Sequence, residues 1–261
     1  MNKLLCIFAA FATLTSCMSS YSLDGTTNVS LLDGRMLYLK VFDTDEMVNR
    51  DSCEVVHGKF HFSGSLDTAT IASIYMDNNN LMPLVLEDGD ISIRIDQTQM
   101  VLSGTPLNDS LYSFLRNYEE LQMRNDDLVH KHDQAIMNGH DMQQVVPQLQ
   151  QEAVDIAKQL DQLVTGTIAN NFDNALGPGI FMIVTASYPF PEMRPWIVDV
   201  MSKATPRFKD DAYVRLYVSE AQHYQNLQNG LETLPQPPAQ ANNATPAPLP
   251  PTPNQMAKPA Q

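Results

Sequence analysis

The four residues Leu14-Thr15-Ser16-Cys17 have the clearest chemical meaning in this chain, because small residues directly before a cysteine form a lipobox. They follow a basic Lys3 and an apolar run over residues 4–12. That run is too short to cross a bilayer and has the length of a signal-peptide core. We therefore predict that residues 1–16 are a lipoprotein signal peptide. Cleavage between Ser16 and Cys17 would leave Cys17 as a lipidated N-terminus.

The charge of the chain limits its other possible partners. The formal net charge is −14 at pH 7, which opposes binding to anionic lipid and to the phosphates of nucleic acid. We therefore expect no nucleic-acid partner, and we expect the acyl chains alone to hold the membrane. Each buried methylene of an acyl chain contributes about 0.8 kcal/mol. No later apolar run approaches the length of about 18 residues that suggests a transmembrane helix.

The residues after the lipobox bear on which membrane carries the anchor. Met18-Ser19-Ser20 follow Cys17. An aspartate directly after the cysteine, which is common in inner-membrane retention, is therefore missing, and so is an acidic run of the kind that marks surface export. We expect a location at the outer membrane, with the protein facing the periplasm.

Cysteine chemistry after cleavage rests on one residue. Cys6 would leave with the signal peptide and Cys17 would carry lipid, so Cys53 would remain as a free thiol. Neither an intramolecular disulfide nor a Cys-x-x-Cys redox pair is then possible. We interpret Cys53 as a small strand residue in the segment 51–55, protected by burial. A reactive thiol is the alternative.

The histidines and carboxylates do not predict a metal site or a catalytic site. His130 and His132 are two positions apart, so on a helix they point about 200° apart and cannot share an ion. His140 lies nearby, and His57 and His61 flank a turn without a third ligand. The paired carboxylates are sequence neighbours that diverge on a helix. We expect no metal, no cofactor and no catalytic residue, with the fourteen methionines filling the core and Trp196 acting as a packing anchor.

Residues 17–104 have the pattern of an antiparallel β-sandwich-like domain. Ile91, Ile93 and Ile95 alternate with polar residues, the period of a half-buried strand. Phe60 and Phe62 alternate in the same way. Strands are predicted over residues 36–42, 59–63, 70–76, 84–86, 90–95 and 100–102. Hairpin-type corners are predicted at Asp33-Gly34, His57-Gly58 and Asp88-Gly89.

A helical period replaces this alternation near Thr105-Pro106, where Thr105 can cap a helix and proline is tolerated in the first turn. Two stripes at spacings of three and four predict an antiparallel helical hairpin that turns around Asn138-Gly139. The first stripe contains Leu111, Phe114, Tyr118, Leu121, Asn125, Leu128, His132 and Ala135, and the second contains Leu149, Ala153, Ile156, Leu160, Leu163 and Thr167. Further helices are predicted over 179–187, 191–203 and 210–229, which completes a helical region at 105–230.

The last part of the chain, residues 231–261, is rich in proline. Nine of its residues from position 234 onward are proline, and Lys258 is the only charge there. Such a composition cannot bury enough surface to offset the entropy of ordering, so we expect a disordered tail. It is either inert or a ligand or spacer that reaches a partner.

Several short motifs over about residues 20–230 occur in the order found in a known family. They resemble the uncharacterised β-rich N-terminal domain of many lipid-anchored thioredoxin-like thiol-disulfide oxidoreductases of Gram-negative bacteria, and the region around Leu176-Gly177-Pro178-Gly179 resembles their connector. The resemblance implies a fold and an envelope location. In those relatives a thioredoxin domain with a Trp-Cys-x-x-Cys active site follows the connector, whereas in this chain the proline-rich tail occupies that position. The resemblance therefore assigns no catalytic residue to this chain. The motifs are Tyr21-Ser22-Leu23-Asp24-Gly25, Arg35 to Lys40, Asp51 to Val55, Gly58 to Gly64, Pro83 to Ile91 and Leu102 to Asn108.

These observations predict an α+β protein that is tethered by lipid and is not an enzyme. The leading hypothesis is an envelope lipoprotein with a binding or scaffolding role, whose sheet or helical hairpin contacts another envelope protein. The alternative is an accessory or regulatory relative of thioredoxin-like oxidoreductases that lacks the redox domain. A third class, metal storage or delivery, predicts that metal stays bound during purification. The sequence leaves the oligomeric state open.

Overall fold

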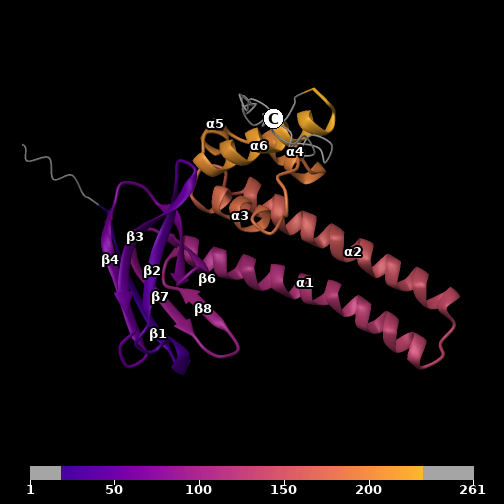
Figure 1. The fold of residues 1–261 in the computed structure, drawn as a ribbon, viewed down its shortest axis with the longest axis horizontal. Helices are drawn as coiled ribbons and strands as arrows, with labels where there is room; N and C mark the ends of the chain where they lie inside the picture. The colour runs from indigo at the N-terminus through magenta and orange to yellow at the C-terminus, as the bar shows by residue number, and fades with distance from the viewer. Residues whose placement is uncertain (1–18, 232–261) are drawn as a thin grey trace, which may run out of the picture.

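A computed structural model describes residues 19–231 of the chain. Eight strands come first and helices follow, which confirms the predicted α+β class. Figure 1 shows the strands as one block and the two longest helices as an arm that projects away from it. The predicted signal peptide and the part of the tail from residue 232 lie outside the described residues.

The strands form two four-stranded sheets. One sheet has the order β4 (Lys59–Leu66), β1 (Ser19–Thr27), β7 (Gly89–Ile95) and β8 (Met100–Ser103). The other has the order β3 (Glu46–Glu54), β2 (Met36–Asp43), β5 (Thr70–Met76) and β6 (Asn79–Leu86). Leu23 and Phe62 of the first sheet and Leu39 and Leu84 of the second belong to one buried core. The neighbours pair antiparallel, as predicted, except β1 and β7, which pair in parallel.

The period-two prediction holds where one face of a strand is buried. Ile91, Ile93 and Ile95 are buried in β7 while Ser92 and Arg94 are exposed. Phe60 and Phe62 likewise point into the core from β4. These alternating side chains anchor the first sheet because each buried residue of this size contributes about 1.5–3 kcal/mol to folding.

Asp33-Gly34 and His57-Gly58 are turns, and Asp88-Gly89 is a bend whose glycine begins β7. Around His57-Gly58, Val56 and Lys59 exchange both backbone hydrogen bonds in an antiparallel bridge, as a hairpin-type corner requires. None of the three corners joins two neighbouring strands of one sheet. Asp33-Gly34, His57-Gly58 and Asp88-Gly89 each lead from one sheet to the other. Within-sheet turns instead occur at Thr44, between β2 and β3, and at Asp77, between β5 and β6, and both residues have positive φ. The prediction missed them because Thr44 and Asp77 adopt a conformation that sequence rules assign to glycine.

Two long helices form the predicted hairpin. α1 (Pro106–Met137) and α2 (Met142–Ala169) are joined at Asn138-Gly139, where Gly139 has a φ of 68°. The remaining helices are α3 (Leu176–Thr185), α4 (Pro195–Lys203), α5 (Pro206–Lys209) and α6 (Ala212–Gln228). They gather at the sandwich end of the hairpin, which leaves the far end projecting (Figure 1). Among residues 19–231, no helix combines the length and the apolar character that crossing a membrane requires.

Asn108 and Glu87 fasten the start of α1 to the end of β6. The amide of Asn108 is buried; its Oδ1 accepts from the backbone N–H of Val85 at 2.8 Å and its Nδ2 donates to the Val85 carbonyl at 2.7 Å. Glu87 Oε1 accepts from the N–H groups of Leu107 and Asn108. The carboxylate therefore caps the helix from another element, at the positive end of the helix dipole.

Thr105 occupies the predicted N-cap position, but its side chain makes no capping bond to the backbone. Its hydroxyl instead accepts from Asn108 Nδ2 at 2.7 Å. The prediction was right about where the helix begins and wrong about which side chain caps it, because Glu87 lies 20 residues away in the sequence from the N–H of Leu107 that it satisfies.

A second junction joins the helices to the same sheet, through its strands β5 and β2. Gly179 of α3 approaches Ile71 of β5 so closely that an added Cβ would lie 2.7 Å from the isoleucine side chain. Phe181, fully buried, makes edge or tilted ring contacts to four aromatic residues of the other helices. One of them, Tyr213, also meets Phe42 of β2 at 5.2 Å between ring centres. The helical cluster and the sandwich therefore share a continuous core.

Candidate functional site

The predicted lipidation residue Cys17 and its cleavage partner Ser16 lie outside the described residues. Ser19, the first described residue, is also the first residue of β1. An anchor at Cys17 would thus connect to the sandwich after Met18. The backbone N–H of Ser20 donates to Asp88 Oδ1 at 2.8 Å, directly after the Glu87 that caps α1, so β1 begins at the end of the sandwich where the arm is attached.

Cys53 lies in β3, an edge strand, and is partly buried, as its interpretation as a strand residue predicts. It pairs with Leu37 of β2. Burial raises the pKa of the Cys53 thiol, the nearby charge of Asp51 raises it further, and a hydrogen bond with the backbone of His61 acts in the opposite direction. Nucleophilic thiols need a lowered pKa, so these surroundings do not activate Cys53.

Two of the histidines, His61 and His132, each lie beside one acidic neighbour. His61 Nδ1 is 2.9 Å from Asp24 Oδ1 across the β1–β4 pair, and His132 Nδ1 is 3.3 Å from Asp133 Oδ1. Within residues 19–231, no group of three or more His, Cys, Asp or Glu side chains is placed to hold a metal ion. Trp196 packs against Phe181 with ring centres 5.7 Å apart, as a packing anchor would.

In the far half of the hairpin, few side chains are buried between α1 and α2, and further contacts between the helices lie on the surface. We call the side chains between the helices the seam. Ala135 is buried there, whereas Asn125, predicted in the seam, is exposed. Lys131 Nζ bridges the helices by binding Glu152 Oε1 at 2.8 Å, and this hydrogen bond is the main cause of a raised pKa of Lys131. Such exposed ion pairs contribute little to stability. The seam side chains of both helices therefore hold this half together.

An exposed apolar surface runs along the far half of α1. Val129 is 63 % exposed, Ile136 54 % and Met137 84 %. Val129 and Ile136 are seven residues apart and hence lie on the same face of the helix. We call these three residues, together with the adjoining groove between α1 and α2, the distal surface. The groove has a volume of about 320 Å³ and is lined by Leu128, Val129, His132, Val146, Leu149, Gln150 and Ala153.

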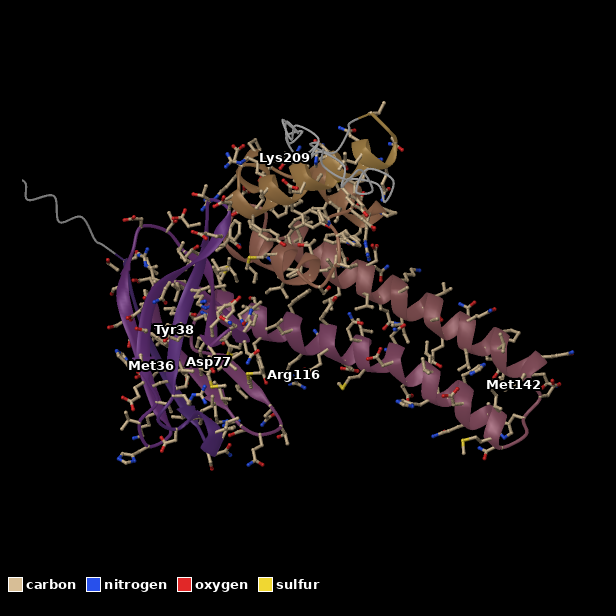
Figure 2. The ribbon with its side chains drawn as sticks, in the orientation of Figure 1. Met36, Tyr38, Asp77, Arg116, Met142 and Lys209 are labelled. Atoms are coloured by element: carbon tan, nitrogen blue, oxygen red, sulfur yellow. The ribbon has the colours of Figure 1, made fainter. Side chains whose placement is uncertain are left out.

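The position of this surface makes it accessible. Figure 2 labels Met142 at the far end of the arm and Arg116 close to the sandwich, and within residues 19–231 no other element lies beside the arm near Met142. Single exposed apolar residues are ordinary, but an apolar groove with exposed aliphatic neighbours at the end of a projecting arm is typical of a binding surface.

The distal surface was not predicted from the sequence, because the apolar stripe identifies only the residues of each helix that face the other helix. Val129, Ile136 and Met137 lie outside the predicted stripe. The sequence did contain a signal. Besides the residues of the predicted stripe, α1 has apolar residues on a face that would be polar if it were exposed only to solvent. Close in sequence to the groove lining, acidic residues outnumber basic ones, and Lys131 pairs with two of the carboxylates. The charged residues are Asp126, Asp127, Asp133, Glu152 and Asp155 against Arg124 and Lys131.

Comparison with known proteins identifies the β-rich part. Residues 21–111 match the family model described as Domain of unknown function (DUF4369). The match covers the described strands from β1 to β8 and extends into α1 as far as Leu111, so it includes the Asn108 junction. A search of curated proteins gave no match. Residues 21–111 of this chain therefore form a DUF4369 domain.

Proposed function

We propose that this protein is an envelope lipoprotein, lipidated at Cys17, that binds another envelope protein without catalysing a reaction. The lipobox and the preceding apolar run support the anchor and the envelope location. We propose that the protein is attached to the outer membrane and faces the periplasm. The distal surface is the single observation that carries the binding role. Burial raises the pKa of the Cys53 thiol, which does not favour a nucleophilic role for it.

The chemistry of the distal surface defines the partner. The groove between α1 and α2 is lined mainly by aliphatic side chains from both helices. An amphipathic helix that lays its apolar stripe into this groove would turn the helical hairpin into a three-helix assembly. Because acidic residues outnumber basic ones among the sequence neighbours of the groove lining, a partner helix with basic residues beside its apolar stripe fits best.

The anchor and the binding surface can be tested separately in cells that produce the protein naturally. Cys17→Ser should abolish incorporation of radiolabelled palmitate, and label that persists would contradict the anchor. Ile136→Ser with Met137→Ser should remove a stoichiometric partner that otherwise co-purifies from detergent-solubilised membranes. Leu31→Ser is the matched control, because Leu31 is a 70 % exposed apolar residue on the sandwich. Retention of the partner by the double variant would contradict binding at the distal surface.

The alternative role, as an accessory or regulatory relative of thiol-disulfide oxidoreductases, makes a different prediction. It would use Cys53 to form a mixed disulfide, which requires a thiolate. Burial raises the pKa of this thiol, so at pH 7 we expect the folded protein to react with a maleimide far more slowly than the unfolded chain. Rapid reaction of the folded protein would favour the redox role instead.

A further inference from the structure

A second hollow lies at the base of the arm, where the α3–α4 loop and α4 meet the long helices. Its volume is about 320 Å³, at the lower end of the range of about 300–1,000 Å³ for ligand pockets. Three aromatic side chains line it from three different elements: Tyr118 of α1, Tyr188 of the α3–α4 loop and Trp196 of α4. We call it the base pocket.

The aromatic walls of the base pocket are held in place by their own contacts. Trp196 Nε1 donates a hydrogen bond to Tyr188 Oη at 3.1 Å. The guanidinium of Arg194 lies 3.7 Å from the centre of the Tyr188 ring. Tyr118 stacks on Phe114 with ring centres 5.6 Å apart. A ligand would therefore meet a preformed site and would not have to order these side chains on binding.

The rim of the base pocket is tied to α6, the last helix before the proline-rich segment. Tyr217 Oη accepts from the backbone N–H of Glu192 and donates to the carbonyl of the same residue, both at 3.1 Å. Phe190 stacks on Tyr224 at 5.4 Å with nearly parallel rings. Figure 1 shows α4 and α6 close together above α2. The chain therefore leaves its last helix near the rim of the base pocket.

The end of α6 is sharply defined. The N–H of Leu231 bonds to the carbonyl of Asn226, the N–H of Gly230 bonds to that of Leu227, and Gly230 has a φ of 69°. This is a Schellman motif, which ends the helix and turns the chain away from its axis. Tyr224 is seven residues before Leu231, a distance of about 10 Å along a helix. The following 30 residues (232–261) can span roughly 90 Å as polyproline II, so the base pocket is well within reach.

The composition of that segment matches the pocket. Five prolines surround Leu249 between residues 246 and 253. Proline-rich segments favour the polyproline II conformation and dock on aromatic-lined grooves at low entropic cost. Proline lacks an N–H but keeps its carbonyl oxygen, so such a segment needs donors from the site. Arg194, which lines the pocket, supplies N–H donors.

We propose that residues 246–253 of this chain dock in its own base pocket. The connection through α6 makes the encounter intramolecular, and short flexible connections give effective concentrations of about millimolar. Weak aromatic–proline contacts would then suffice to keep the site occupied. The proposal does not depend on the lipid anchor or on the distal surface.

The sequence supplies a reporter for this proposal, because Trp196 is the single tryptophan of the chain. We would measure acrylamide quenching of its fluorescence in the full chain in detergent. Changing Pro246, Pro248, Pro250, Pro251 and Pro253 together to serine should raise the quenching constant about twofold or more, because a segment buried in the pocket would cover the Trp196 ring that lines it. The matched control changes Pro235, Pro237 and Pro238 to serine and should quench like the wild type.

Two additions distinguish the possible occupants. A synthetic peptide of residues 244–255 should restore protection to the five-proline variant, and Tyr118→Ser should lose protection although its tail is intact. Circular dichroism would verify that each variant is folded. Equal quenching of the wild type and the five-proline variant would overturn the proposal. Protection that appears only at concentrations where sedimentation detects dimers would also overturn it, because the occupant would then be the tail of a second copy.

Discussion

The near and far halves of the α1–α2 hairpin use the same helical period but end in different surroundings. Near the sandwich, Leu111 and Phe114 are buried and Asn108 is bonded to β6. Far from it, Ile136 and Met137 are exposed. The strands and helices α3 to α6 pack against the near half of the hairpin and not against its far half. The hairpin therefore has one end that stabilises the fold and another whose apolar residues remain available for binding.

This comparison predicts that substitutions near the base change stability and that substitutions at the far end change binding. The largest loss should follow Phe181→Ala, because Phe181 is fully buried and contacts four aromatic rings. We expect the free energy of unfolding in urea to fall by about 3–5 kcal/mol. Val154→Ala on the arm, where the side chain is 61 % exposed, is the control and should change it by less than about 0.5 kcal/mol. A loss at Phe181 no larger than that would contradict a shared core.

The next largest effect should come from the junction at Asn108. Asn108→Ala would leave the N–H and carbonyl of Val85 without their partner, and each unsatisfied buried group costs about 1–3 kcal/mol. A total loss of about 2–4 kcal/mol is expected in urea unfolding. Asn117→Ala, on an exposed face of the same helix, serves as the comparison and should be nearly neutral. Equal stability of the two variants would show that the amide does not fasten α1 to β6.

Alkaline pH should destabilise the helical cluster beside the near half of the hairpin through its partly buried tyrosines. Burial raises the pKa of Tyr213, partly opposed by its hydrogen bond with Thr185. The unfolded chain therefore loses this proton first, from about pH 10, and stability falls as the pH rises through the pKa of the folded protein. Tyr213→Phe keeps the ring but not the ionisation, so its unfolding free energy should decline less between pH 9 and pH 11. Parallel declines for the two proteins would contradict this account.

The smallest effect on stability is expected at the distal surface. The double change Ile136→Ser and Met137→Ser replaces side chains that are already exposed, so the unfolding free energy should change by less than about 0.5 kcal/mol. The same variant should lose its protein partner. A loss of several kcal/mol would mean that these residues support the hairpin, and the contrast between the two halves would fail.

Sequence patterns predicted the elements whose burial follows a simple period. The alternation of Ile91, Ile93 and Ile95 identified β7, and the change to a helical period identified the start of α1. The pattern missed two strands. In β1 the buried positions alternate, but Gly25 occupies one of them, so only Tyr21 and Leu23 carry the apolar signal. The edge strand β3 has polar residues such as Arg50 and Ser52 and a register shift opposite Leu39. A strand that contributes little to the core carries little periodic signal.

Contacts between distant elements could not be predicted from local patterns. The parallel pairing of β1 with β7 and the capping of α1 by Glu87 join residues that are far apart in the sequence. Periodicity tells which face of an element is buried but not which element covers it. For the same reason the sequence located the hairpin but did not show that the other described elements would leave its far half uncovered.

Site-specific photocrosslinking tests the binding role of the distal surface most directly. A photoreactive phenylalanine analogue would replace Met137 on the arm or, as the control, Leu31 on the sandwich, both of which are exposed apolar residues. In the native envelope we predict that position 137 gives one discrete crosslinked protein and that position 31 does not. Absence of a crosslink at 137, or the same product from both positions, would contradict the claim that the arm is where this protein holds its partner.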